Sequence, residues 1–119
     1  MKILVTGSKG QLGNTLLARQ PDDVTIVGVD RDDIDIGVAD DVAALVKSEK
    51  PDLIVHAAEY TAVDRAESDE DDARRVNVFG ARNLAATGAR LIHVSTYFVF
   101  DGEARQPYSP DDATNPLSA

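Results

Sequence analysis

The sequence contains no cysteine and no tryptophan, and aromatic residues make up only 5% of its 119 residues. The absence of cysteine excludes disulfide bonds and thiolate metal sites, and it fits the cytoplasmic location that we expect. No apolar run approaches the roughly 20 residues of a membrane-spanning helix, and nothing at the amino terminus is typical of a signal peptide. His, Asp and Glu show no metal-ligand spacing. We therefore expect neither a membrane partner nor a metal site.

Positive charge is also scarce, with 12 Lys and Arg against 21 Asp and Glu, which gives a net charge of −9. A surface this acidic repels a polyphosphate backbone, so we expect no nucleic-acid partner. An anionic small ligand would have to be held locally, by backbone amides and a helix end. We interpret the acidic runs, such as residues 69–72, as solvated helix starts and loops.

The chain does contain a regular alternation of apolar runs and helical patterns. Strands are predicted at residues 2–6, 24–29, 53–58 and 91–95, the first and the last as buried strands, and helices at residues 11–19, 40–50 and about 68–87. Near-continuous apolar strands separated by helices are typical of a parallel sheet that is covered on both faces, with its first strand central. The sequence predicts an α/β fold with a Rossmann-type doubly wound parallel sheet. Residues 102–119 are predicted to be a polar, proline-containing loop that leads to a further element. Because the sequence ends before that element, the fold is predicted to be truncated.

Three glycines follow the first predicted strand as Gly-x-x-Gly-x-x-Gly, at Gly7, Gly10 and Gly13. Glycine at these positions allows a tight turn, close approach of a pyrophosphate and close packing of helix on strand. The helix that starts near Gln11 would direct its free amides at the phosphates. The spacing indicates a dinucleotide-binding loop, with a simple tight turn as the alternative. Lys9 either adds charge near the phosphates or faces solvent.

Asp30 ends the second predicted strand, twenty residues after the middle glycine. A carboxylate at this position can accept hydrogen bonds from the adenosine ribose, which favours NAD, whereas an adjacent arginine can hold the 2′-phosphate of NADP. Asp30 and Arg31 are both present, so the pattern leaves NADP or NAD open. A plainer interpretation is that Asp30 caps a loop.

Three further segments resemble a known family: residues 56–67 (HAAEYTAVDRAE), residues 76–84 and residues 94–102 (VSTYFVFDG). Together with the glycine spacing, they resemble the dTDP-4-dehydrorhamnose reductases, a family of extended short-chain dehydrogenases/reductases. The resemblance covers essentially all of this chain but less than half of a typical member. It implies that residues 1–119 are the amino-terminal part of an NAD(P)-binding Rossmann domain, with the substrate domain absent.

The resemblance also implies a role for individual residues. Gly7, Gly10, Gln11, Leu12 and Gly13 would line the cofactor phosphates, Asp35 and Ile36 would lie by the adenine, and Ala57, Ala58 and Tyr60 would lie beside the ribose and nicotinamide. Thr96 would be the catalytic hydroxyl that forms a hydrogen bond with the substrate carbonyl. His56 and His93, by contrast, are expected to be core or strand-end histidines.

The activity implied for the parent enzyme is NAD(P)H-dependent reduction of a nucleotide-sugar substrate, from dTDP-4-dehydro-L-rhamnose to dTDP-L-rhamnose. The parent could be a homodimer. The family's Tyr-x-x-x-Lys supplies a proton donor whose pKa the lysine lowers. Tyr60, Tyr97 and Tyr108 have no lysine four residues later, so we expect the 119-residue chain to be inactive.

Tyr97 and Phe98 depart from the Asp and Tyr that the family usually has after its threonine. This departure leaves open a catalytically silent dinucleotide-binding or regulatory module, of the type found in the regulatory subunit of methionine adenosyltransferase. A nucleotide-sugar epimerase or dehydratase is a third possibility, which the segment at residues 61–64 disfavours.

Overall fold

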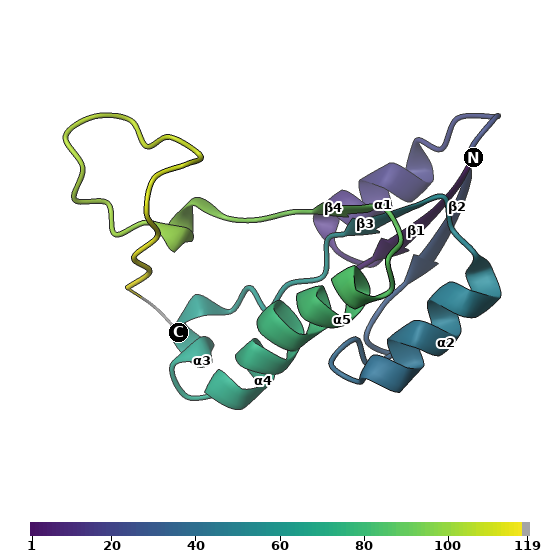
Figure 1. Ribbon diagram of the computed structural model, residues 1–119, viewed down its shortest axis with the longest axis horizontal. Helices are drawn as coiled ribbons and strands as arrows, with labels where there is room; N and C mark the ends of the chain where they lie inside the picture. Colours follow the sequence, from purple (N-terminus) through teal and green to yellow (C-terminus); the bar gives the residue numbers. More distant parts are fainter. Residues whose placement is uncertain (118–119) are drawn as a thin grey trace.

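The computed structural model describes residues 1–117 (Figure 1). The elements in chain order are β1 (Lys2–Thr6), α1 (Gln11–Ala18), β2 (Thr25–Val29), α2 (Ala39–Glu49), β3 (Leu53–His56), α3 (Val63–Ala66), α4 (Glu70–Arg74), the π-helical segment η1 (Arg75–Gly80), α5 (Ala81–Ala86), β4 (Leu91–His93) and the 3-10 turn η2 (Tyr97–Val99). The predicted alternation of strands and helices is confirmed.

The four strands form one parallel sheet in the order β2-β1-β3-β4, which confirms the predicted parallel sheet with its first strand inside. Helices cover both faces (Figure 1). Leu4 of β1 belongs to the cluster that includes Val42 of α2 and Leu84 of α5. On the other face, a Cβ added at Gly28 of β2 would lie 2.9 Å from Leu17 of α1. Helices on opposite faces are the mark of a doubly wound sheet.

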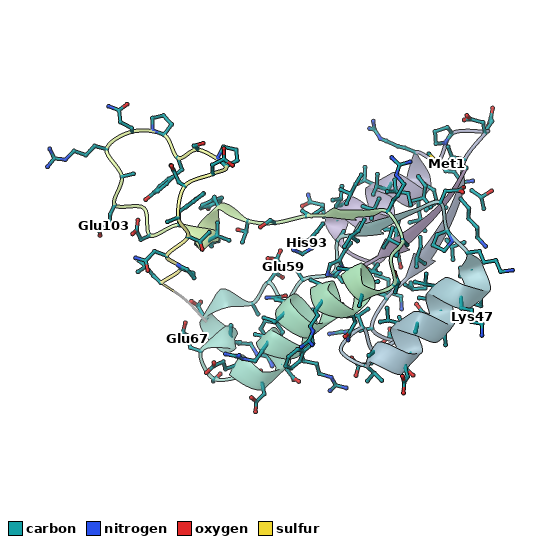
Figure 2. The ribbon with its side chains drawn as sticks, in the orientation of Figure 1. Met1, Lys47, Glu59, Glu67, His93 and Glu103 are labelled. Atoms are coloured by element: carbon teal, nitrogen blue, oxygen red, sulfur yellow. The ribbon has the colours of Figure 1, made fainter. Side chains whose placement is uncertain are left out.

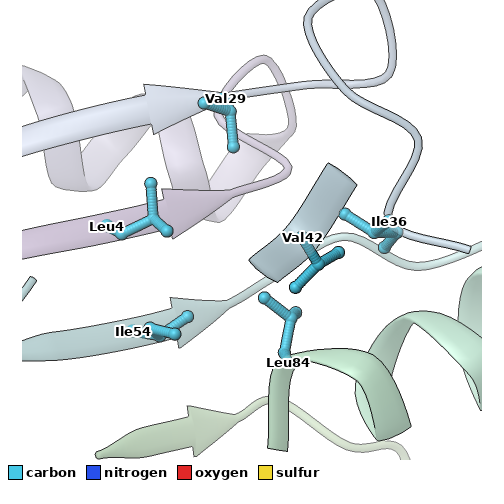
Figure 3. Close-up of a cluster of buried hydrophobic side chains, with 6 residues drawn as sticks. All are labelled: Leu4, Val29, Ile36, Val42, Ile54 and Leu84. Atoms are coloured by element: carbon cyan, nitrogen blue, oxygen red, sulfur yellow. The ribbon is translucent and has the colours of Figure 1, made fainter. Parts of the chain in front are cut away.

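The main hydrophobic core lies between the sheet and the helices α2 and α5 (Figure 3). Its buried side chains are Leu4, Val29, Ile36, Val42, Ile54 and Leu84. Burial of one such aliphatic side chain contributes roughly 1.5–3 kcal/mol. Ile36 belongs to the loop that follows β2, so the core also anchors this loop near the carboxyl-terminal end of the sheet.

The long helix predicted for residues 68–87 is divided into α4, η1 and α5, and the short helix α3 precedes it. A Cβ added at Gly80, where η1 ends, would lie 2.6 Å from Ile36 Cδ1, so the backbone of η1 packs directly on the loop after β2. Single π-helical turns are frequent at functional sites. This one carries side chains toward the carboxyl-terminal end of the sheet.

The fourth strand is shorter than predicted, and the prediction that residues 91–95 are buried was wrong. Ile92 is 52% exposed and Val94 is 37% exposed. Among the described strands, β4 pairs with β3 alone, so its outer edge is unpaired within residues 1–117. After β4 the chain leaves the sheet as an extended arm that ends in a loop away from the other elements (Figure 1).

The structure also bears on membrane insertion and on metal binding. None of the helices within residues 1–117 has the length and hydropathy that a membrane crossing requires. Within the same residues, no group of three His, Asp or Glu side chains is placed to hold a metal ion.

Candidate functional site

A crevice of about 850 Å³ lies at the carboxyl-terminal ends of β1, β2 and β3. The loops that follow these three strands and the start of η1 line it. Glu59 and His93 mark this end of the sheet, and Met1 lies at the opposite end (Figure 2). The strand order reverses between β1 and β3, and doubly wound sheets bind ligands where their strand order reverses.

The three glycines of the first loop differ in what their missing side chains allow. Gly7 has a φ of +75°, and a Cβ there would lie 2.6 Å from Ala57 O; a Cβ at Gly13 would overlap Gly7 O. The protein's own packing therefore requires these two glycines. Apart from its chain neighbours, a Cβ at Gly10 would meet only Gly7 O within 4 Å among residues 1–117, at 3.2 Å. Gly10 is exposed, so its bare backbone is open to a ligand.

The amino terminus of α1 lies beside Gly10 at the crevice. Within the described structure no side chain caps this helix, and its first turn contains no acidic residue. In contrast, the first turn of α2 contains Asp40 and Asp41. The free N–H groups of a first helical turn carry partial positive charge. In this acidic chain, the start of α1 is therefore suited to hold an anion.

The carboxylate of Asp30 lies on the other side of the glycine loop, held by backbone amides. Lys9 N–H donates to Oδ2 at 2.8 Å, and Arg31 N–H donates to Oδ1 at 2.9 Å. Asp30 N–H donates to Asp33 Oδ2 at 2.9 Å, which fixes the start of the loop. Each carboxylate oxygen of Asp30 retains a lone pair with which to accept a hydrogen bond from a ligand hydroxyl.

The side chain of Lys9 reaches the loop after β2. Its Nζ lies 2.7 Å from Asp32 Oδ2. The hydrogen bond and the charge of Asp32 raise the pKa of Lys9, and Lys9 in turn lowers the pKa of Asp32, with a smaller contribution from the charge of Arg31. Lys9 is thus paired with an acid in the structure, a partner that the sequence did not indicate.

Asp35 and Arg75 form an ion pair across the crevice. Asp35 Oδ1 also accepts the N–H of Gly37 at 2.9 Å. Arg75 comes from η1 and lines the crevice, although sequence reasoning did not identify it. No local signal could have done so, because one arginine in an acidic helix looks like any solvated residue and its partner is far away in the sequence.

The loop after β3 is tied to η1 through Tyr60. The N–H of Tyr60 donates to Asn77 Oδ1 at 2.8 Å, and its hydroxyl donates to Asp69 Oδ2 at 3.0 Å. Desolvation, followed by the Asp69 hydrogen bond, raises the pKa of Tyr60, so its hydroxyl stays protonated at neutral pH. Ala57 and Ala58 lie between β3 and Tyr60, and both line the crevice.

His56 lies at the end of β3 and is only 1% exposed. Its Nδ1 is hydrogen-bonded to Thr6 Oγ1 at 2.7 Å, and its ring stacks on His93 with centroids 5.0 Å apart. Its Nε2 has no hydrogen-bond partner among the described residues. Burial, and secondarily the charge of His93, lower the pKa of His56 to about 4. His56 is therefore a neutral core histidine at pH 7, as expected from the sequence, but the expected satisfied hydrogen bonding is not met at Nε2 within the described residues.

The crevice brings together most of the site residues that the sequence suggested, namely Gly7, Gly10, Gln11, Asp30, Arg31, Asp35, Ile36, Ala57, Ala58 and Tyr60. Three others do not line it. Gly13 is buried beneath the loop, and Leu12 is 42% exposed on α1. Thr96 is the N-cap residue of η2 on the arm, where its Oγ1 accepts the N–H of Phe98 at 3.3 Å.

The arm has a second hollow, of about 570 Å³, bordered by aromatic side chains. Phe100 stacks on Tyr108, whose hydroxyl donates to Asp101 Oδ1 at 2.6 Å. The hydrogen bonds from Tyr108 and Asn115 lower the pKa of Asp101 to about 2. The arm thus has its own polar and aromatic contacts, separate from the crevice.

In sequence and in structure, the chain is similar to dTDP-4-dehydrorhamnose reductases. A dTDP-4-dehydrorhamnose reductase of Sinorhizobium fredii is 41% identical over 122 residues, which cover 99% of this chain and 41% of that protein. The crystal structure of a dTDP-4-dehydrorhamnose reductase from Clostridium acetobutylicum superposes with a TM-score of 0.93 at 37% identity, covering 99% of this chain and 44% of that one. The enzyme from Bacillus anthracis in complex with NADP gives a TM-score of 0.91 at 34% identity, covering 98% and 44%.

The chain thus spans about two fifths of the length of these relatives. The family model described as RmlD substrate binding domain matches residues 1–119. Because this match extends over the entire chain, the chain belongs to the RmlD substrate binding domain family.

Proposed function

We propose that this chain is the dinucleotide-binding part of an NAD(P)H-dependent reductase that acts on a nucleotide-linked 4-keto sugar. In a longer protein of this family, the reaction would convert dTDP-4-dehydro-L-rhamnose to dTDP-L-rhamnose. The observation that carries the proposal is the open backbone at Gly10, beside an uncapped helix start that has no acidic residue in its first turn. A pyrophosphate needs both features.

The residues of the crevice fit a dinucleotide. Backbone amides of Gly10 and Gln11 would hold the pyrophosphate, and Asp30 would accept hydrogen bonds from the adenosine ribose. Asp35 and Ile36 would flank the adenine. The small side chains of Ala57 and Ala58 would let the nicotinamide half lie against the backbone. When bound, the cofactor would supply the hydride.

We assign Thr96 the role of polarising the substrate carbonyl. Its Oγ1 accepts a hydrogen bond from Phe98 N–H, which leaves its own O–H free to donate. Reduction also needs a proton donor, and none of the three tyrosines is followed by a lysine four residues later. General acid catalysis typically contributes about 10²–10⁴-fold. The 119-residue chain should therefore bind dinucleotide without measurable reductase activity.

The test of dinucleotide binding is the substitution Gly10→Val, measured by titration calorimetry with NADH and NADPH. The branched side chain would occupy the place of the pyrophosphate, so affinity for both should fall at least about tenfold. Ala43→Val also introduces a branched side chain, on the exposed face of α2, and should leave affinity unchanged. Unchanged binding by Gly10→Val, with unchanged thermal stability, would show that the glycine loop is not the phosphate site.

A second candidate function is dinucleotide binding without catalysis. It is favoured by Tyr97 and Phe98, which stack on each other on the arm and are 78% and 49% exposed. The discriminating assay uses a longer protein that contains this chain, with NADPH and the 4-keto sugar. Turnover would support the reductase, and binding without turnover would support the silent module.

A further inference from the structure

We propose that Arg75 binds the adenine of a dinucleotide held in the crevice, with the flat face of its guanidinium stacked on the adenine ring. The inference rests on the proposed dinucleotide site and adds to it a residue that neither the sequence pattern nor the resemblance assigned. It follows from the way in which Arg75 is held beside Asp35 and Ile36, the two residues proposed to flank the adenine.

Arg75 is the first residue of η1, and its side chain reaches across the crevice to the carboxylate of Asp35. The stem of the side chain lies on the backbone of Gly37, where an added Cβ would overlap Cγ of Arg75 and lie 3.1 Å from its Nε. The φ of Gly37 is not in the left-handed region, so its backbone conformation does not require glycine. The missing side chain of Gly37 therefore serves to seat Arg75.

The loop that receives Arg75 is fixed on two sides. Asp35 Oδ1 accepts the N–H of Gly37 at 2.9 Å, so the carboxylate that pairs with Arg75 is itself held in place. Asn83 Nδ2 of α5 donates to the carbonyl oxygen of Ile36 at 2.9 Å, and the Ile36 side chain is only 8% exposed. Arg75 is thus oriented before a ligand arrives, which lowers the entropic cost of binding.

The ion pair leaves the face of the guanidinium available. The N–H groups of arginine all lie in the plane of the guanidinium, so the contact with Asp35 is made at the edge of that plane. The Arg75 side chain is 50% exposed and lines the crevice. Arginine stacks favourably on flat aromatic rings, and unstacked bases are often packed on guanidinium planes in RNA-binding proteins. Arg75 therefore offers the kind of surface on which an adenine ring binds.

A phosphate is a poorer occupant of this position than an adenine. The charge of Arg75 is matched by Asp35, whose carboxylate would repel an anion that approached the guanidinium. Adenine carries no net charge, so it avoids this repulsion. In the proposed site the phosphates lie at Gly10 and the ribose at Asp30, which leaves the adenine as the part of this half of the ligand that Arg75 would contact.

The experiment measures the dissociation constants of ADP and of inorganic pyrophosphate by titration calorimetry, for the 119-residue chain and its variants. ADP carries the adenine, whereas pyrophosphate reports on the phosphate site alone. Arg75→Ala should weaken ADP binding about three- to tenfold, the range expected for one stacking cation, and should change pyrophosphate binding less than twofold. Arg82→Ala removes the same charge from an exposed position of α5 that does not line the crevice, and should change neither.

Arg75→Lys separates stacking from charge. Lysine keeps the positive charge and can pair with Asp35, but it lacks the flat group, so ADP affinity should stay at least about twofold below that of the original chain. Gly37→Ala places a methyl group where the stem of Arg75 lies. It should weaken ADP binding in the original chain and have a smaller effect when Arg75 is already alanine. Thermal unfolding shows whether each variant is folded.

Equal losses of ADP and pyrophosphate affinity in Arg75→Ala would mean that Arg75 acts by charge alone, and the inference would then be wrong. Full ADP affinity in Arg75→Ala or in Arg75→Lys would also overturn it. In these cases a loss of ADP and pyrophosphate binding in Gly10→Val would still support the proposed dinucleotide site. Failure of the original chain to bind ADP and NADH would instead overturn the proposed function, and the inference with it.

Discussion

Asn77, in the π-helical segment η1, forms hydrogen bonds with both the N–H and the carbonyl group of Tyr60, in the loop after β3. Its Oδ1 accepts the Tyr60 N–H at 2.8 Å, and its Nδ2 donates to Tyr60 O at 3.5 Å. One side chain thus satisfies both backbone groups of a residue that lies between a strand and a helix. This pairing fixes the floor of the crevice relative to η1.

We expect Asn77→Ala to destabilise the protein by about 1–2 kcal/mol, because it leaves a part-buried N–H without its acceptor. Asn77→Asp keeps an acceptor for the shorter bond and should retain most of the stability. Chemical denaturation followed by circular dichroism measures both. Equal losses in the two variants would mean that the bond to Tyr60 N–H contributes nothing.

The core substitution Leu84→Ala should cost about 2–5 kcal/mol of unfolding free energy, because Leu84 is fully buried against the sheet and α2. Leu12→Ala is the matched control, since Leu12 of α1 is 42% exposed and its truncation should cost less than about 1 kcal/mol. Urea denaturation gives both values. If the two variants had the same free energy of unfolding, the side chains packed between the sheet and α5 would not form the main core.

The buried His56 should make stability depend on pH. Its folded-state pKa of about 4 lies below the ordinary value of 6.5, so between these values the unfolded state binds more protons than the folded state. The free energy of unfolding should therefore fall as the pH decreases from 6.5 to 4, by up to about 3 kcal/mol for a shift of this size.

His56→Asn removes this titration. The difference in free energy of unfolding between the original chain and the variant should therefore shrink as the pH decreases from 6.5 to 4. Thermal unfolding from pH 7 to pH 4 measures it. Parallel pH profiles would indicate that His56 titrates alike in the folded and unfolded states. His93→Gln serves as a second comparison, because His93 is exposed and its charge is only the smaller cause of the His56 shift.

Asp30→Ala should weaken NADH binding about tenfold and NADPH binding less, because only the ribose of NADH can donate its 2′-hydroxyl to this carboxylate. Asp40→Ala, an acid in the first turn of α2, is the control and should leave both affinities unchanged. Fluorescence titration of the reduced nicotinamide measures both. A uniform loss for the two cofactors would remove the assigned role of Asp30.

The sequence by itself determined the parallel sheet, the inner position of β1 and the place of the glycine loop. These features depend on local signals: apolar runs of strand length, and glycines at fixed spacing between a strand and a helix. It also placed Asp30 at the end of the second strand, because a strand ends where its apolar run ends. Where the same local reasoning extended the last strand through Ser95 as a buried one, it failed: an apolar run has the same pattern whether or not another element covers it.

Only the tertiary structure decided which charged and polar groups meet. The pairs Lys9–Asp32, Arg75–Asp35 and Asn77–Tyr60 each join loops or helices that are distant in the sequence. Their partners are set by the crossovers of the sheet, which bring the loops after β1, β2 and β3 to one edge. The sequence could name the acids and bases of this edge, but whether a given lysine faces a ligand or a carboxylate depends on distances that only the fold defines.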